Sequence, residues 1–218
     1  MVLGDATDWS ASFVSVDERI LRRIVAVWPQ CLSVLSANPT EDTITINLIR
    51  LLCNDAIVRR ICHWIEFQFE PFGIDENGAA FSKGAIDMAV LLDWERTRYV
   101  AYECKRLNVH ANGVKASLAT RYVTEGVKRF VTEQYAEALP VGCMLGYILD
   151  GDADDALTSV HAAIGTHKAT VGLISGPVTI APIETVKRFG TTHTRGNAKA
   201  NIEVRHALLA FSATVLSA

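Results

Sequence analysis

The sequence predicts an α/β (α+β) protein in which a mixed central sheet is flanked by helices. Apolar residues recur near helical spacing through residues 15–62, and the period then changes to two over residues 63–70. An amphipathic stretch at 117–138 is followed by a continuous apolar run at 141–149. The 218 residues contain no internal repeat and no low-complexity linker, so we expect a single domain over residues 1–218.

The first helix is expected over residues 15–35, within an N-terminal helical extension that covers residues 1–38. Ser15 and Asp17 are suitable caps for its beginning. Pro29 has no amide hydrogen and should kink or split this helix.

A second helix should follow the proline-containing break, with Thr40 as its N-cap. Glu41 and Asp42 would lie in its first turn, where the helix dipole stabilises acidic side chains. We expect the helical region to continue, with an interruption, to Cys62.

A three-strand meander is expected next. Polar and apolar residues alternate over 63–70, which predicts a strand that ends at Pro71. Residues 84–92 and 98–105 predict two further strands, joined by the polar turn 93–97.

The pairing of the last two strands brings charged side chains together. If the turn is symmetric, Leu92 faces Arg98, and Asp87 then lies directly opposite Glu103. Lys105 shares their face of the sheet, because side chains two positions apart point the same way. Like charges directly opposite each other destabilise a sheet, so two facing acids require an explanation.

A divalent cation supplies that explanation. Mg²⁺ (or Mn²⁺) binds carboxylates, water and phosphate oxygens, and Asp87 and Glu103 would be its ligands. The ammonium group of Lys105 could hold a scissile phosphate, or orient and deprotonate the attacking water.

The motif Asp87, fifteen residues, Glu103-Cys104-Lys105 resembles the PD-(D/E)XK nuclease superfamily, which has the restriction-endonuclease-like fold. The expected order of helix, three-strand meander, helix and strand is similar to the αβββαβ core of that family, over residues 40–150. One departure is that Ile86 stands where the family motif has proline.

The resemblance implies a metal-dependent nuclease that hydrolyses phosphodiester bonds of nucleic acid, with DNA favoured over RNA, in defence or repair. It implies that Asp87, Glu103 and the backbone carbonyl of Cys104 bind the metal and that Lys105 is catalytic. A further acid commonly comes from the helix before the meander, and Glu41 is our choice. Glu41 is equally well explained as an acid favoured by the helix dipole, and two rivals lie on the first strand, Glu66 and Glu70.

The helix expected over 117–138 has an exposed face beside the proposed metal site. Its polar residues are Arg121, Glu125, Lys128 and Thr132, and Arg129 follows Lys128 in the sequence as a third cation of the helix. The three cations would neutralise phosphates of the nucleic acid, and Glu125 would support the site from outside the ligand set. A solvated face with an Arg129–Glu133 pair is an equal alternative for each residue separately. Gly126 in mid-helix indicates close packing.

The C-terminal third, residues 151–218, should complete the sheet. We expect a helix over 152–168, capped by Asp152, and strands at 170–174 and 201–211. The polar, basic stretch 187–199 is expected to be a loop, and contact with substrate is one of its possible roles. The histidines His161, His167, His193 and His206 lack the spacing of metal ligands.

Charge and composition restrict the partners. The chain carries a formal charge of −3, yet residues 83–135 hold nine basic and six acidic side chains, a local +3. Five cysteines without a Cys-x-x-Cys pair disfavour a disulfide framework or a cysteine-zinc site. With no apolar run suited to a membrane and no signal-peptide pattern, we expect a cytoplasmic protein.

Two other functions remain open. The chain could be a non-catalytic nucleic-acid-binding or assembly subunit. For the nuclease itself, a homodimer or a partner subunit is expected if it cuts both strands of a duplex, because that needs two sites. A carboxylate-pair hydrolase of sugars is weaker, since Lys105 would have no evident role there.

Overall fold

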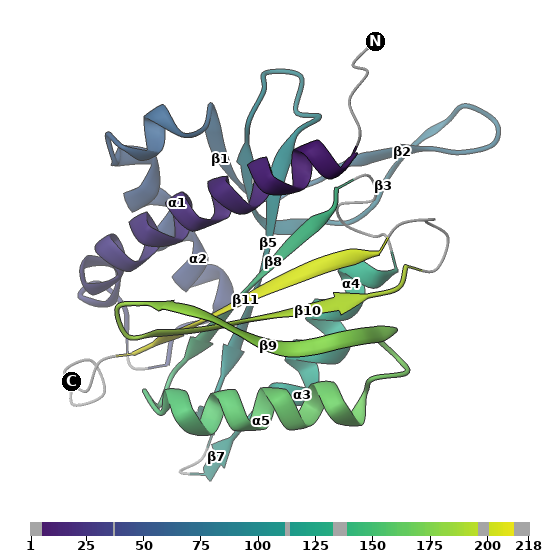
Figure 1. Cartoon of the computed structure of the whole chain (residues 1–218). Helices are drawn as coiled ribbons and strands as arrows, with labels where there is room; N and C mark the ends of the chain where they lie inside the picture. Colours follow the sequence, from purple (N-terminus) through teal and green to yellow (C-terminus); the bar gives the residue numbers. More distant parts are fainter. Residues whose placement is uncertain (1–5, 37, 112–113, 133–138, 196–200, 212–218) are drawn as a thin grey trace.

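A seven-stranded mixed sheet runs through the protein (Figure 1). The computed structural model describes residues 6–36, 38–111, 114–132, 139–195 and 201–211. In spatial order the strands are β1 (Trp64–Phe69), β4 (Ile86–Leu91), β5 (Tyr99–Leu107), β8 (Val141–Ile148), β11 (Ile202–Ala210), β10 (Val186–His193) and β9 (Leu173–Ile183). The central strand β8 is parallel to β5 and to β11, and the other neighbours are antiparallel. The prediction of an α/β protein with a mixed sheet is therefore confirmed.

Helices cover both faces of this sheet (Figure 1). On one face lie α1 (Ala6–Leu32) and α2 (Glu41–Asn54), which contact β5. The other face is covered by α5 (Ala153–Thr166) and by a helical segment made of α3 (Ala119–Arg121), the π-helical turn η2 (Tyr122–Val127) and α4 (Lys128–Val131). The order helix α2, meander β1-β4-β5, helical segment and parallel strand β8 agrees with the order expected between residues 40 and 150.

The beginning of α1 differs from the prediction. The helix already includes Ala6, so Ser15 and Asp17 lie inside it, and the prediction that they cap it was wrong. Asp17 is buried and accepts hydrogen bonds from Tyr102 on β5 and Arg205 on β11. Pro29 lies in the last turn and does not split the helix.

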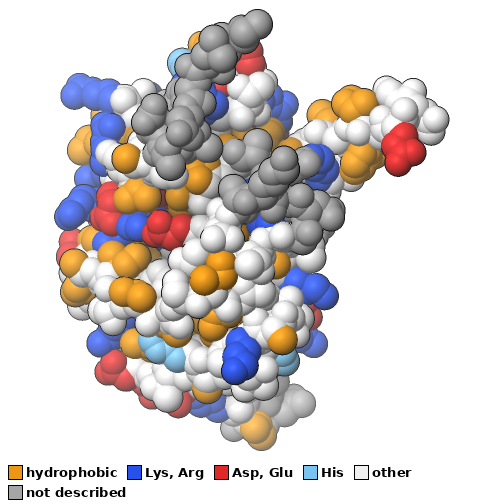
Figure 2. Space-filling view, turned by 45° about the vertical axis from the view of Figure 1, so that its right-hand side comes forward, with side chains coloured by type: hydrophobic (Ala, Val, Ile, Leu, Met, Phe, Trp, Pro, Cys, Tyr) orange, Lys and Arg blue, Asp and Glu red, His pale blue; other side chains and the backbone are white. Residues whose placement is uncertain are grey.

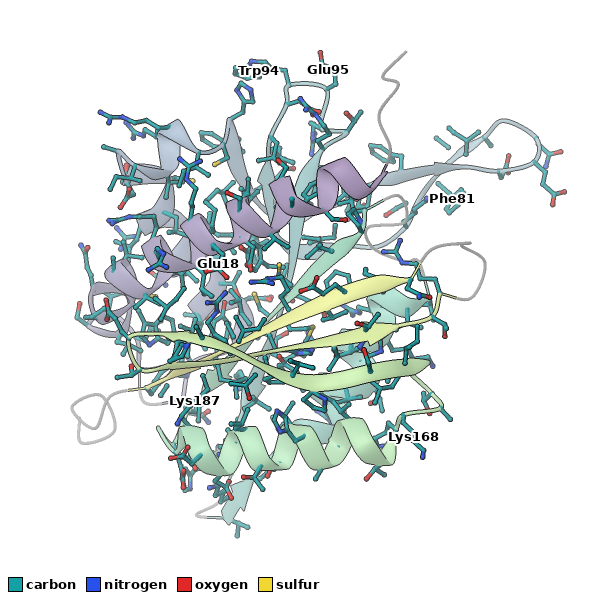
Figure 3. The ribbon with its side chains drawn as sticks, in the orientation of Figure 1. Glu18, Phe81, Trp94, Glu95, Lys168 and Lys187 are labelled. Carbon is teal, nitrogen blue, oxygen red and sulfur yellow. The ribbon has the colours of Figure 1, made fainter. Side chains whose placement is uncertain are left out.

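The next residue of α1 is also tied to the sheet. Figure 3 labels Glu18, whose carboxylate accepts hydrogen bonds from Arg188 on β10 and Arg205 on β11. These contacts hold the N-terminal helix against strands that are about 170 residues away along the chain.

The second helix begins as predicted. The side chain of Thr40 accepts a hydrogen bond from the backbone N–H of Thr43, and Glu41 and Asp42 lie in the first turn. The interruption after Asn54 is followed by a short 3-10 helix, η1 (Val58–Arg60).

The hairpin register is the one that the symmetric turn predicts. Met88 pairs with Tyr102 and Leu91 with Tyr99, and the N–H of Leu92 donates to the carbonyl of Arg98. The carboxylate of Asp93 accepts several hydrogen bonds from the end of the turn, which fixes its length.

Three parts of the prediction need correction. Residues 187–193 form most of β10 rather than a loop, and residues 196–200 of that stretch lie outside the described part of the chain. Strand β9 runs on to Ile183, far beyond 174. The helix expected over 117–138 is broken into α3, η2 and α4, and residue 133 with its proposed ion pair is also outside the description.

Two small hairpins were not predicted. Strands β6 (Val109–Ala111) and β7 (Val114–Ala116) form one, and β2 (Phe72–Ile74) and β3 (Ala80–Ser82) form the other. The second projects from the molecule as an arm in Figure 2, and Phe81 on it is labelled in Figure 3.

The buried hydrophobic side chains form one cluster that extends from Phe13 in α1 to Phe211 after β11. Within the described residues, every helix is too short or too polar to cross a membrane.

Candidate functional site

Four oxygen-bearing groups surround the ammonium nitrogen of Lys105. Its Nζ lies 2.8 Å from Oε1 of Glu103, 2.9 Å from Oε1 of Glu41 and 3.7 Å from Oδ2 of Asp87. It also donates to the backbone carbonyl of Cys104 at 2.8 Å. The groups predicted to bind metal, the lysine predicted to be catalytic and the candidate additional acid Glu41 thus meet at one place.

Strand geometry explains why β5 supplies Lys105 together with two of the four oxygen-bearing groups. Glu103 and Lys105 alternate with Tyr102 and Cys104, so the two pairs of side chains point to opposite faces. Tyr102 binds Asp17 of α1, whereas Lys105 lies beside Gly126 of η2. The charged pair therefore faces the helical segment, and the carbonyl of Cys104 lies between them along the chain.

Asp87 is placed by a local opening of the sheet. The β4–β5 pairing ends at Met88 opposite Tyr102. The next hydrogen-bonded amide of β5 would be that of Cys104, and this N–H donates instead to Oδ2 of Asp87 at 2.7 Å. The carboxylate of Asp87 thus replaces the backbone carbonyl of β4 that would otherwise accept this hydrogen bond, and it stays next to Lys105.

Glu41 comes from the first turn of α2. One carboxylate oxygen accepts from Lys105, and the other accepts from the backbone N–H of Arg106 at 3.0 Å. The rivals lie elsewhere, since Glu66 binds Arg96 and Glu70 accepts a hydrogen bond from Ser82. Of the three candidates for the additional acid, only Glu41 joins this cluster among the contacts of the described residues.

Burial sets the electrostatics of the two central acids. The side chain of Glu103 is fully buried. Its burial, together with the nearby charge of Asp87, outweighs the cations Lys105 and Arg129 and raises the pKa of Glu103 to about 7. Burial likewise raises the pKa of Asp87. The pKa of Lys105 is raised, because Glu103, Asp87 and Glu41 more than offset its own burial, so the amine keeps its proton at neutral pH.

The donor set suits a hard divalent cation. All the converging ligand atoms are oxygens, which Mg²⁺ and Mn²⁺ prefer. Oε2 of Glu103 is buried and has no hydrogen-bond partner among the described residues, so one ligand oxygen is unused. As the side chains stand, the described residues contain no group of three acidic, histidine or cysteine side chains arranged to hold a metal, and the ammonium of Lys105 stands among the carboxylates.

A cleft of about 400 Å³ opens next to this cluster. Its lining includes Glu41, Lys105 and Arg106 on one side and Arg121, Glu125 and Arg129 on the other. Asp87 and Glu103 do not line it, whereas Lys105 and Arg129, which both bind Glu103, do. A ligand in the cleft would therefore meet these two cations rather than the buried acids.

The helical segment brings only some of its predicted residues to the cleft. Arg121 and Glu125 are exposed and 3.8 Å apart, and both line the cleft. Arg129 contacts the site directly, since its Nη1 donates to Oε1 of Glu103 at 2.7 Å. Lys128 is exposed on α4 but is not part of the lining, so its predicted contact with nucleic acid has less support.

Gly126 explains how closely this segment approaches the strands. A Cβ at this position would lie 2.5 Å from Cε of Met144 and 3.5 Å from Cγ of Lys105. The close packing inferred from a mid-helix glycine is therefore present. The π-helical turn around it is a feature often found at functional sites, and the sequence carried no signal for it.

A buried hydrogen-bond chain behind the site was also missed. Tyr122 of η2 contacts Nδ1 of His206, whose Nε2 contacts the hydroxyl of Thr191. The same hydroxyl contacts Nε2 of His193, and Nδ1 of His193 lies 2.7 Å from the carbonyl of Val171. These residues come from four distant parts of the chain, so no spacing in the sequence could have revealed the chain of contacts.

Comparison with models of protein families, with curated proteins and with solved structures gave no match for this chain. Any statement on function therefore depends on the geometry described above.

Proposed function

We propose that this protein is a divalent-metal-dependent nuclease of the restriction-endonuclease-like class, and that it hydrolyses phosphodiester bonds of nucleic acid. The observation that carries the proposal is the convergence of Glu41, Asp87, Glu103 and the carbonyl of Cys104 on Lys105 beside a cleft. Three carboxylates gathered at one buried place are costly for a fold unless cations balance them.

The arrangement of elements supports the same class. Helix α2 supplies the additional acid, antiparallel strands β4 and β5 supply the motif, and β8 pairs in parallel with β5 after the helical segment. This is the order that the resemblance implies for an αβββαβ core. The missing proline before Asp87 does not disturb the contacts of its carboxylate.

In the proposed mechanism Asp87, Glu103 and the carbonyl of Cys104 would hold Mg²⁺ or Mn²⁺, and Glu41 would assist as the additional acid. The metal, when bound, lowers the pKa of a coordinated water and stabilises negative charge on the transferred phosphoryl group. The protein positions these ligands from two strands and a helix, and the buried walls exclude bulk water from Glu103.

Lys105 acts as a hydrogen-bond donor in this proposal. As an ammonium group it would orient the attacking water and the scissile phosphate. Arg121 and Arg129, which line the cleft, would bind the neighbouring phosphates.

A second candidate, a non-catalytic nucleic-acid-binding or assembly subunit, has one observation in its favour. Lys105 and Arg129 both bind Glu103, so cations of the protein already partly neutralise the acids. A chain that had lost metal binding would need such compensation.

The decisive experiment incubates the protein with plasmid, linear duplex, single-stranded DNA and RNA, each with Mg²⁺, Mn²⁺ or EDTA. We expect cleavage that requires the metal and is lost in Asp87→Asn and Lys105→Met. Glu66→Gln and Glu70→Gln are matched controls, because these acids lie outside the cluster, and both should cleave as the wild type does. Cleavage that persists in Asp87→Asn would place the reaction elsewhere, and binding without any cleavage would favour the second candidate.

A further inference from the structure

Arg129 and Lys105 share one carboxylate oxygen of Glu103, a side chain that a metal at this site would need as a ligand. The other oxygen, Oε2, has no hydrogen-bond partner among the described residues. Nη1 of Arg129 lies 2.7 Å from Oε1 of Glu103, and the same oxygen lies 2.8 Å from Nζ of Lys105. Glu103 is fully buried, so the two cations are the charges that compensate its own in the described structure. A divalent cation bound to Glu103 would stand in close contact with the guanidinium group.

Charge counting indicates which of the two cations should leave. When Glu103 is ionised, as it largely is at about pH 8, Glu41, Asp87 and Glu103 carry three negative charges and Lys105 and Arg129 carry two positive charges. A divalent cation added to this set makes it net positive, whereas departure of one monovalent cation restores neutrality. Lys105 is bound by three further oxygens of the cluster besides Glu103, including the Cys104 carbonyl. It is also the more buried of the two cations, so it is the harder one to displace.

The side chain of Arg129 borders the cleft and can move into it. This side chain is 35% exposed, whereas that of Lys105 is only 12% exposed. Its neighbours Phe130 and Val131 on α4 are buried and hold the backbone of this turn in place. Rotation of the long side chain alone would therefore move the guanidinium from the buried carboxylate toward a ligand in the cleft.

We propose that Arg129 couples metal binding to phosphate binding: it holds Glu103 while no metal is bound and turns to a substrate phosphate when a divalent cation takes that carboxylate. This inference rests on the proposed nuclease function and adds to it a regulation of the same site. By linkage, metal and nucleic acid should then strengthen each other's binding, and the coupling should depend on Arg129.

The first test measures Mn²⁺ affinity without substrate, from the signal of free Mn²⁺ in electron paramagnetic resonance at about pH 8. Arg129→Gln should bind Mn²⁺ about tenfold more tightly than the wild type, because the competing charge is absent. Arg129→Lys keeps the charge and should stay close to the wild type. A merely structural role of Arg129 would instead weaken Mn²⁺ binding in Arg129→Gln.

Matched controls distinguish the Arg129–Glu103 contact from the general electrostatic effect of cations that line the cleft. Arg121→Gln removes a cation from the same cleft that pairs with Glu125 rather than Glu103, and its Mn²⁺ affinity should change less than about twofold. Arg96→Gln removes a surface arginine paired with Glu66 and should bind Mn²⁺ as the wild type does.

The second test measures the affinity for a duplex oligonucleotide in EDTA and in Ca²⁺, which supports binding without requiring turnover. The wild type should bind more tightly in Ca²⁺, and Arg129→Gln should lose most of that gain while its affinity in EDTA stays within about threefold. Equal or weaker Mn²⁺ binding in Arg129→Gln would overturn the inference while leaving the metal site intact. A folded wild type that binds no Mn²⁺ would overturn the proposed function itself, and the inference with it.

Discussion

The carboxylate of Asp87 accepts a hydrogen bond from the backbone N–H of Cys104, 2.7 Å away on the neighbouring strand. The carbonyl of the same Cys104 accepts from Lys105. The amide of Cys104 is thus held by Asp87, and its carbonyl points to the ammonium group of Lys105. The position of this carbonyl, a proposed metal ligand, therefore depends on Asp87, which is a proposed ligand too.

We expect Asp87→Asn to separate structure from function. The amide oxygen of asparagine can still accept from Cys104, so the free energy of unfolding should stay within about 1 kcal/mol of the wild type. The negative charge is lost, and metal-dependent cleavage should fall by about 100-fold or more. Chemical denaturation and single-turnover cleavage measure the two effects. Asp87→Ala, which leaves the buried N–H without an acceptor, should in addition lose about 1–3 kcal/mol of stability.

Replacement of Lys105 should make the thermal stability of the protein depend on a divalent metal. In EDTA, Lys105→Met leaves three carboxylates near one another and should destabilise the fold by about 3–5 kcal/mol. Mn²⁺ should restore much of that loss, which thermal unfolding with and without the metal would show. Lys187→Met is the matched control, since Lys187 pairs with the exposed Asp154, and it should cost at most about 1 kcal/mol. If the unfolding temperature of Lys105→Met is the same with and without Mn²⁺, no metal binds at this position.

Asp17 should be a large contributor to stability although it is remote from the cluster. It is buried and binds Tyr102 at 2.9 Å and Arg205 at 2.7 Å, so Asp17→Ala leaves a buried phenol and guanidinium without this partner. We expect a loss of about 3–5 kcal/mol in urea denaturation. Asp154→Ala, at an exposed position of α5, should lose about 1 kcal/mol or less. A similar small loss in Asp17→Ala would show that α1 is held by other contacts.

Asp93 should make the hairpin turn sensitive to acid. Burial by itself would raise its pKa, but hydrogen bonds from Arg98 and Thr97 outweigh burial and lower the pKa of Asp93 to about 2, from an ordinary 3.8. A carboxyl whose pKa is lower in the folded state contributes stability above the ordinary pKa, and that contribution disappears as the pH falls to the folded value. The stability difference between wild type and Asp93→Asn should therefore be constant above pH 5 and shrink between about pH 4 and pH 2. Urea denaturation over that range measures it, and a difference that grows on acidification would contradict the assignment.

Local patterns in the sequence predicted the central hairpin well. The symmetric five-residue turn predicted the register, which the observed pairs from Leu91–Tyr99 to Met88–Tyr102 confirm. The ladder ends there, one position before the predicted pair of Asp87 with Glu103. The additional acid was less accessible, because Glu41, Glu66 and Glu70 differ in their tertiary surroundings rather than in their local pattern. Only the packing of α2 against the end of β5 brings Glu41 to Lys105.

Strand β10 shows why other parts could not be predicted. Its polar residues look like a loop, yet Arg188, Thr191 and His193 are all buried and bind partners from α1, β11 and the segment before β9. Polar residues are favoured in a core only where such partners exist, and partners distant in the chain leave no local pattern. The break of the helix at η2 is similar, since the close approach of Gly126 to Met144 depends on β8.

The chain of contacts from Tyr122 to Val171 has a fixed direction. A carbonyl can only accept, so Nδ1 of His193 must carry the proton, and its Nε2 must accept from Thr191. Thr191 then accepts from Nε2 of His206, and Nδ1 of His206 accepts from the phenol of Tyr122. A second proton on either ring would turn its acceptor nitrogen into a donor, and the hydroxyl that faces it would have to stop donating and accept instead. Burial opposes that second proton, since it lowers the pKa of both His206 and His193. One backbone oxygen at the far end therefore dictates the tautomer of two imidazoles and the direction of the hydroxyl hydrogen of Tyr122 in the π-helical turn.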